Sequence, residues 1–259
     1  MPTLVLRGVR YTYPGAAQPT LDVESLQIVA GQSLLLRGPS GCGKSTLLSL
    51  AAGVLMPQRG TVELMGEDWS ALRGAARDAR RVDHVGYIFQ QFNLLPYLGV
   101  LDNVLLPCGF SKRRRERARA WAGSTRAAAV ALLEALELPP ALHDRPASDL
   151  SVGQQQRVAA ARALIGQPDL VIADEPTSAL DEDRREAFMR LLMAQCAQAG
   201  SALLFVTHDA RLAEHFDAAV DLPSINRAVA TPGAGDATGP HAASVAHPMS
   251  QIPHGPEGY

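Results

Sequence analysis

Cysteine and positive charge are both scarce in this 259-residue chain, and each shortage excludes a class of protein. The three cysteines are odd in number and widely spaced, which excludes a secreted disulfide scaffold and a site with paired cysteine ligands. Lysine and arginine number 24 against 26 acidic residues, so the net charge of -2 supplies no overall field that attracts nucleic-acid phosphates. We therefore expect a reducing compartment and no nucleic-acid partner.

Long hydrophobic runs are missing as well. Glu134 and Glu137 interrupt the longest candidate, so no run reaches the roughly 20 residues that span a bilayer. The N-terminus has no basic segment before a long apolar stretch, and we expect no signal peptide. A composition of 47% hydrophobic and 19% charged residues is typical of a folded globular domain. Any role at a membrane must therefore come through a partner.

Short apolar runs alternate with helical patterns, which predicts an α/β fold with a mostly parallel sheet. The expected strands are residues 33–37, 84–89, 170–173 and 202–207. Residues 91–167 are dominated by Ala, Leu, Arg and Glu at helix-compatible spacing and have no strand-like segment, so we interpret them as an inserted helical lobe. Residues 231–259 are rich in Gly, Pro, Ala, Ser and His without periodicity, which predicts a disordered tail after a folded domain over residues 1–230.

A glycine-rich segment follows the first expected strand and precedes a helical run. It matches the phosphate-loop pattern in its required context, with the residues Gly38, Pro39, Ser40, Gly41, Cys42, Gly43, Lys44, Ser45 and Thr46. The glycines let successive backbone N–H groups converge on phosphate oxygens, and the helix directs its positive dipole end at the same charge. Lys44 would then reach the β- and γ-phosphates of a nucleotide, and Ser45 would hold Mg²⁺.

Two adjacent carboxylates, Asp174 and Glu175, follow the strand at residues 170–173. Such a pair is costly to keep close unless a cation or a reaction uses it. Asp174 fits a partner of Mg²⁺, and Glu175 fits the group that polarises an attacking water. Alone, the pair is more often an ordinary acidic helix start, so this interpretation rests on the phosphate loop. His208 also follows a strand, and its position alone leaves a γ-phosphate contact and an ordinary histidine equally open.

A third motif, residues 150–154 before a helix, has the sequence Leu-Ser-Val-Gly-Gln. Here the chain resembles the ATP-binding subunits of ABC transporters, whose signature is Leu-Ser-Gly-Gly-Gln, over about residues 4–221. The resemblance implies a phosphate-loop NTPase core with an N-terminal antiparallel β region and a helical subdomain at about residues 91–167. It also places Gln90 in the family's glutamine loop and identifies His208 as the switch histidine. Tyr13 is similar to the residue that stacks on adenine, with Tyr11 as the alternative.

The same resemblance implies a mechanism and partners. Lys44, Glu175 and His208 would be catalytic, and Ser45, Gln90 and Asp174 would hold Mg²⁺. Two copies would pack head to tail, with each ATP between one phosphate loop and the partner's signature residues Ser151, Gly153 and Gln154. Transmembrane permease subunits on separate chains would complete the transporter, which places this chain at the cytoplasmic face of the membrane.

Five features either refine the family assignment or depart from the family pattern. Residues 89–96 resemble the lipoprotein-releasing and macrolide-efflux branch, which favours export or release. Val152 stands where the family has glycine, and residues 221–226 replace the usual closing strand and glycine turn. The basic run at residues 112–119 is interpreted as a solvated helix face, with a contact to anionic lipid headgroups as the alternative. The tail histidines His241, His247 and His254 are too widely spaced for a metal site and are interpreted as solvated.

Two other functions stay open at this point. A soluble ABC-type ATPase of translation or DNA repair would carry tandem nucleotide domains or a long coiled coil, and this sequence shows one motif set and no sustained heptads. An importer ATPase is the alternative within transport. A generic phosphate-loop kinase or GTPase fails to explain residues 150–157.

Overall fold

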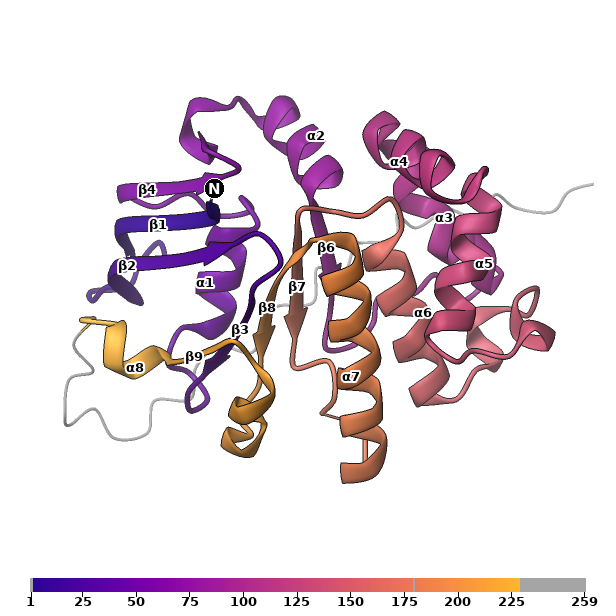
Figure 1. The fold of residues 1–259 in the computed structure, drawn as a ribbon. Helices are drawn as coiled ribbons and strands as arrows, with labels where there is room; N and C mark the ends of the chain where they lie inside the picture. Colours follow the sequence, from indigo (N-terminus) through magenta and orange to yellow (C-terminus); the bar gives the residue numbers. More distant parts are fainter. Residues whose placement is uncertain (1, 179, 229–259) are drawn as a thin grey trace, which may run out of the picture. The chain divides into compact units, whose positions relative to one another are not determined.

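A five-stranded parallel sheet forms the centre of the computed structural model, which describes residues 2–178 and 180–228 (Figure 1). The strand order is β6-β7-β8-β3-β9, and every pairing is parallel. The strands are β3 (Ser33–Arg37), β6 (Val85–Ile88), β7 (Leu170–Asp174), β8 (Ala202–Val206) and β9 (Ala218–Asp221). The four strands expected from the sequence are thus confirmed at nearly the expected bounds.

The edge strand β9 corrects the expectation for the end of the domain. Asp221 pairs with Arg37 of β3, so a closing strand is present and ends where the unusual segment begins. The short helix α8 (Leu222–Ile225) then takes the place of the glycine turn. β9 has only four residues and none of them is fully buried, so it lacks the apolar alternation that marks a strand in a sequence.

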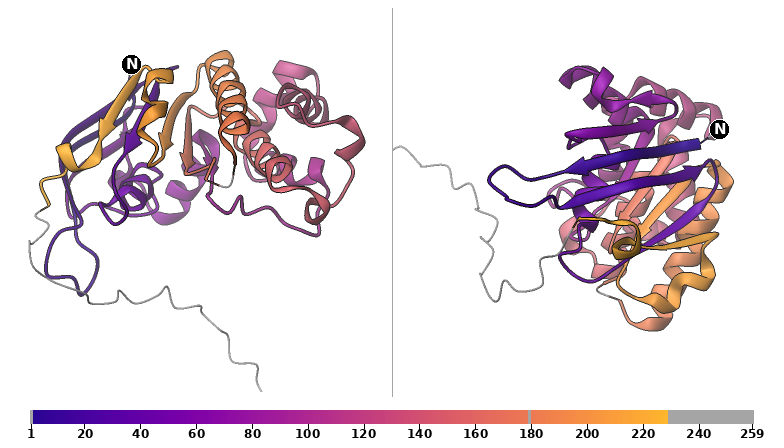
Figure 2. Two further views of the ribbon diagram at one scale, coloured as in Figure 1. Left: turned by 90° about the horizontal axis from the view of Figure 1, so that it is seen from below. Right: turned by 90° about the vertical axis from the view of Figure 1, so that its left-hand side faces the viewer.

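A second, antiparallel sheet with the order β2-β1-β4-β5 confirms the expected N-terminal β region. Its strands are β1 (Pro2–Tyr11), β2 (Leu21–Val29), β4 (Arg59–Leu64) and β5 (Glu67–Asp68), and the right-hand view of Figure 2 faces them. Helix α1 (Lys44–Ala51) packs in one hydrophobic cluster with this sheet and one face of the parallel sheet. Along β7, Leu170 and Ile172 join that cluster, while Val171 and Ala173 face the opposite one.

Helices cover that opposite face. Residues 91–167 contain α3 (Val100–Phe110), α4 (Lys112–Ala122), α5 (Thr125–Ala135), α6 (Val152–Leu164) and two 3-10 turns (Pro140–Leu142, Ala147–Asp149), which confirms the inserted helical subdomain. The remaining helices are α2 (Gly74–His84), α7 (Glu182–Ala199) and the 3-10 turns Trp69–Ala71 and Ala210–His215. Within residues 2–178 and 180–228, none of the helices combines the length and the apolar character needed to cross a bilayer. The predicted tail lies outside the described residues.

The basic run forms most of α4, and its interpretation as a purely solvated face is wrong. Arg114 is buried and donates from Nε to the carbonyl oxygen of Ile165 at 2.8 Å, past the end of α6. Arg113 and Arg117 pair with the carboxylate of Asp169, at 3.1 Å and 3.5 Å. These three arginines therefore hold α4 against the turn that leads into β7. Other cations of the run, Lys112 and Arg119, are exposed.

Candidate active site

The predicted chemical segments meet at the carboxyl edge of the parallel sheet. The phosphate loop follows β3, Asp174 ends β7, His208 follows β8 and Gln90 follows β6. These four strands are consecutive neighbours in the sheet, so their carboxyl ends lie side by side. Ligands of open α/β sheets bind at this edge, which makes it the candidate active site.

The phosphate loop requires glycine at its last turn. Gly43 has φ 104° and caps α1, and a Cβ atom there would lie 2.9 Å from the side chain of Leu21 and 3.2 Å from the carbonyl oxygen of Thr20. No side chain caps this helix start, so its first N–H groups are available to an anion. The local sequence therefore builds an anion site directly from the backbone.

Lys44 is folded back onto this loop. Its Nζ donates to the carbonyl oxygens of Gly38 at 2.8 Å and Pro39 at 2.9 Å, and the side chain is almost fully buried. A cavity of about 370 Å³ opens beside it, lined by Thr20, Ser40, Gly41, Gly43, Lys44, Ser45, Thr46, Gln90, Asp174 and Glu175. The structure thus brings most of the predicted phosphate loop, the predicted metal ligands and Glu175 to one cavity, whereas His208 does not line it.

Asp174 of the acidic pair is subject to charges of opposite effect. Burial raises the pKa of Asp174 and the charge of Glu175 raises it further, while Lys44 acts in the opposite direction. A hydroxyl from Ser45, an amide oxygen from Gln90 and a carboxylate from Asp174 are hard oxygen donors of the kind that Mg²⁺ takes together with substrate phosphates. The described residues contain no cluster of three His, Cys, Asp or Glu side chains able to hold a metal by themselves. The residues present therefore fit Mg²⁺ shared with a phosphate ligand.

Glu175 adopts a strained backbone conformation at the end of β7. Its φ is 44°, a region that non-glycine residues rarely enter, and its N–H donates to the carbonyl oxygen of Val206 at 3.0 Å. This hydrogen bond to β8 fixes the turn, and the carboxylate lines the cavity. The exposed ring of His208 lies nearby, with Nδ1 3.8 Å from Oε1 of Glu175. The two predicted catalytic side chains therefore approach each other but do not hydrogen-bond.

The two tyrosines differ in a way that bears on adenine stacking. Tyr11 is buried in the core with 7% of its surface exposed, whereas Tyr13 is 43% exposed. The Tyr13 hydroxyl and Thr46 Oγ1 are 3.2 Å apart, which places Tyr13 at the end of the phosphate loop. The rings of Tyr11 and Tyr13 pack edge to face, with their centroids 5.0 Å apart. Of the pair, Tyr13 thus offers an exposed ring beside the cavity.

The signature residues lie apart from this cavity. Ser151 and Gln154 form a capping box at the start of α6, in which Ser151 N donates to Gln154 Oε1 at 2.9 Å. None of Ser151, Gly153 and Gln154 is among the cavity-lining residues, and Ser151 is exposed. Cys42 is also outside the lining, with its thiol packed behind the loop against Gly38. The chain therefore does not bring its own signature to its own phosphate loop.

Thr20 is a cavity-lining residue that sequence reasoning missed. It precedes β2, and its backbone N–H donates to the carbonyl oxygen of Tyr11 at 2.8 Å, which brings it beside Gly43. No motif marks it, because its place depends on the pairing of β1 with β2.

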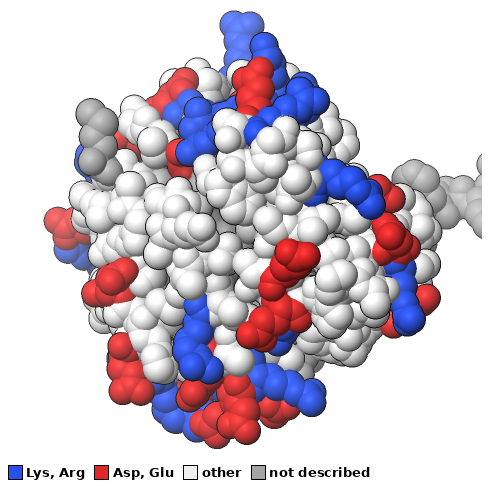
Figure 3. Space-filling view, turned by 45° about the vertical axis from the view of Figure 1, so that its right-hand side comes forward, with Lys and Arg blue, Asp and Glu red and all other residues white. Residues whose placement is uncertain are grey.

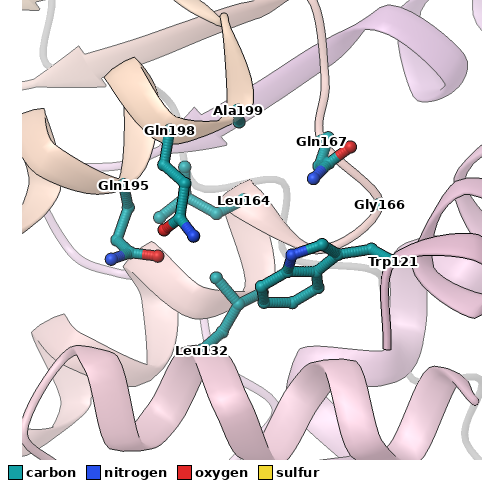
Figure 4. Close-up of a pocket in the computed structure, with 8 residues that line it drawn as sticks. All are labelled: Trp121, Leu132, Leu164, Gly166, Gln167, Gln195, Gln198 and Ala199. Carbon is teal, nitrogen blue, oxygen red and sulfur yellow. The ribbon is translucent and has the colours of Figure 1, made fainter. Parts of the chain in front are cut away.

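A much smaller cavity lies between α4, α5, α6 and α7, where the indole of Trp121 faces Leu132 (Figure 4). Its volume is about 20 Å³, the size of a single water molecule. It is lined by apolar and glutamine side chains without an ionisable group, so it offers no candidate chemistry.

Comparison with known proteins agrees with this geometry. The family model described as "ABC transporter" matches residues 21–178. The lipoprotein-releasing system ATP-binding protein LolD 2 of Caulobacter vibrioides is 39% identical over 223 residues, which cover 85% of this chain and 94% of that protein. The LolD protein of Anaeromyxobacter dehalogenans is 41% identical, with 85% and 90% covered.

Two further likenesses extend the comparison. An uncharacterized ABC transporter ATP-binding protein of Mycobacterium tuberculosis is 39% identical over 83% of this chain, and the match spans only 62% of that longer relative. A solved dimeric ATP-binding cassette, MJ0796, in a post-hydrolysis state with ADP and Pi, superposes with a TM-score of 0.71 at 33% identity, covering 85% of this chain and 94% of that one. The chain therefore belongs to the ABC transporter family, among its ATP-binding proteins.

Proposed function

We propose that this chain binds and hydrolyses ATP as the motor subunit of an ABC transporter of the lipoprotein-releasing type. One observation carries the proposal: the phosphate loop, the acidic pair and Gln90 line a single cavity at the carboxyl edge of adjacent strands. The relatives named LolD support the release type, because they match over nearly their whole length.

The residues divide the chemistry between them. Backbone N–H groups of the loop bind the phosphates, and Lys44 exchanges the carbonyl oxygens of Gly38 and Pro39 for the γ-phosphate. Glu175 orients the attacking water and accepts its proton, and His208 donates a hydrogen bond to the γ-phosphate. When bound by Ser45, Gln90 and Asp174, Mg²⁺ would neutralise phosphate charge. Tyr13 stacks on the adenine ring.

The signature residues act on a second copy of the chain. Ser151 is exposed on the chain's surface and lies apart from the chain's own cavity, so its hydroxyl is available to the nucleotide of a partner. Gly153 lies close to Leu180, in the loop that follows the acidic pair, since a Cβ atom on it would be 3.8 Å from the leucine side chain. Head-to-tail packing would enclose two ATP molecules between two copies, and the solved cassette MJ0796 is itself dimeric.

An apolar groove of about 460 Å³ supports docking of transmembrane permease subunits. It lies between α2 and α3 and includes Val54, Phe89 and Phe110, which are 57%, 38% and 79% exposed. Such exposed hydrophobic side chains mark protein-interaction sites. Phe89 lines the groove and directly precedes Gln90, which lines the cavity. A movement of Gln90 at the γ-phosphate is therefore passed directly to the groove. Docking there holds the chain at the cytoplasmic face of the membrane.

Lys44→Ala tests the proposal. The variant removes the ammonium charge that contacts the γ-phosphate during its transfer. The rate of ATP hydrolysis should therefore fall by at least about a hundredfold, while the circular dichroism spectrum stays unchanged. Lys112→Ala is the matched control, because Lys112 is an exposed lysine on α4. Turnover near the wild-type rate in the Lys44 variant would contradict the phosphate-loop assignment.

A further inference from the structure

Helices α2 and α4 together carry an excess of positive charge that the nucleotide chemistry does not use. Residues 73–84 and 111–122 contain ten Lys or Arg against three Asp or Glu, a net charge of +7 in a chain of net charge -2. The two helices are neighbours, because Ser111 Oγ donates to Asp83 Oδ1 and the Asp169 carboxylate bonds both His84 of α2 and Arg113 of α4. Figure 3 shows blue side chains gathered along the top of the molecule, where Figure 1 places both helices.

Internal contacts account for only part of this charge. Arg113, Arg114 and Arg117 are held by Asp169 and by the end of α6, as described above. Within residues 2–178 and 180–228, Arg73, Arg77 and Arg119 form no ion pair, and Lys112 has only a 3.7 Å contact with Glu116. We call these four residues, Arg73, Arg77, Lys112 and Arg119, the basic face.

The cations at the starts of α2 and α4 are unfavourably placed for the helices themselves. The first turn of α4 begins Lys-Arg-Arg-Arg and contains no acidic residue, although a helix N-terminus already carries partial positive charge. The first turn of α2 also lacks an acidic residue and follows Arg73. An anionic surface against the basic face would offset this repulsion.

Apolar groups border the basic face. Phe110 ends α3 immediately before α4 and is 79% exposed, and it lines the groove together with Arg81 and Val82 of α2. Cations beside an exposed aromatic ring are typical of segments that lie at a bilayer surface, where the ring enters the interface and the cations meet headgroups. Because the free cations are spread over two helices rather than set around a pocket, they fit a surface of many negative charges.

We propose that the basic face of α2 and α4 binds the anionic headgroups of a phospholipid bilayer. The contact is electrostatic and requires neither ATP nor a permease subunit, so it goes beyond the proposed function. This contact would orient the chain with its groove toward the membrane, where the permease subunit lies.

Vesicle flotation with the full chain tests this proposal. Wild-type protein should float with vesicles of equal parts phosphatidylglycerol and phosphatidylcholine, should not float with pure phosphatidylcholine, and should detach at about 1 M salt. Arg73→Gln, Lys112→Gln and Arg119→Gln combined should weaken partition into the anionic vesicles on the order of a hundredfold, from about 1 kcal/mol per charge.

The matched control removes three exposed arginines elsewhere, Arg126→Gln, Arg184→Gln and Arg190→Gln, with the same change in net charge. It should float like the wild type, and both triple variants should keep their melting temperature and ATP hydrolysis. Equal flotation of the two triple variants would overturn the proposal. So would a wild-type chain that ignores anionic vesicles but is retained by polyglutamate beads, which would assign the basic face to an acidic protein segment. Since flotation is measured without ATP, its failure and a failure of the ATPase assignment are separate results.

Discussion

The side-chain amide of Asn226 donates a hydrogen bond to the backbone carbonyl of Cys42 at 3.2 Å. The same nitrogen donates to the carbonyl oxygen of Thr20 at 3.0 Å, and the amide oxygen accepts from Asp22 N at 2.8 Å. The segment after β9 therefore ties the phosphate loop to the start of β2. Its Pro223 also packs behind the loop, since a Cβ atom on Gly38 would lie 3.0 Å from the proline ring.

Asn226→Ala should loosen the phosphate loop without touching the reacting atoms. Two donated hydrogen bonds are lost, and at about 1 kcal/mol each the Kd for ATP should rise on the order of tenfold while kcat changes little. Equilibrium titration with a fluorescent ATP analogue and steady-state kinetics measure the two effects. Ser224→Ala is the control, because among the described residues Ser224 Oγ bonds only Asp221 O in the same segment. A variant with unchanged Kd would show that the loop holds its shape alone.

Tyr13→Ala should weaken ATP binding by about tenfold, because one stacking face for the adenine is lost. Tyr13→Phe should retain the affinity, since the ring remains and only the contact with Thr46 is removed. Tyr11→Ala should instead lower the melting temperature, because it empties a buried site in the core. A different result would assign adenine stacking to Tyr11: a Tyr11→Ala variant that keeps its melting temperature but binds ATP more weakly than Tyr13→Ala does.

Asp169→Asn should destabilise the domain in a pH-dependent way. Burial alone would raise the pKa of Asp169, but the hydrogen bond from His84 and the charges of Arg113 and Arg117 outweigh it, so its pKa is lowered. A carboxylate with a lowered folded-state pKa contributes stability above its ordinary value near 3.8 and loses it as pH falls through the folded value. Urea unfolding should therefore show a loss of about 2 kcal/mol at about pH 7 that shrinks toward about pH 3.

Lys112→Gln is the control for this measurement, since the exposed Lys112 side chain should change the free energy of unfolding by less than about 0.5 kcal/mol. An Asp169 effect that is independent of pH would mean that packing, and not the charge, holds α4 in place.

The edge that carries the candidate active site could be predicted from the sequence because each of its motifs is local. The phosphate loop, Asp174 with Glu175, and His208 each follow a run of apolar residues, and parallel strands bring their carboxyl ends to one edge. The inserted helical subdomain was equally accessible, since helix-compatible spacing dominates residues 91–167 and no strand-like segment interrupts them.

Pairings between distant residues could not be predicted in the same way. Arg113 and Asp169 are 56 positions apart, and Asn226 and Cys42 are 184 apart, so no local pattern links either pair. In the sequence, α4 therefore resembles a uniformly solvated basic face, although the fold binds Arg113, Arg114, Arg115 and Arg117, four of its six cations. The short strand β9 is stabilised by its pairing with β3 rather than by a pattern of its own.

Glu175→Gln tests most directly whether two copies are joined by ATP and released by its hydrolysis. In this mechanism each ATP also contacts Ser151 of the partner copy, and Glu175 activates the attacking water. The variant keeps size and hydrogen bonding but loses the base, so ATP binding should survive while hydrolysis slows by about a hundredfold or more. Size-exclusion chromatography with ATP and Mg²⁺ should then show a dimer, and adding Ser151→Arg to the same chain should return it to a monomer. If the double variant dimerises as well as the single one, the signature residues do not complete the partner's site, and head-to-tail packing is contradicted.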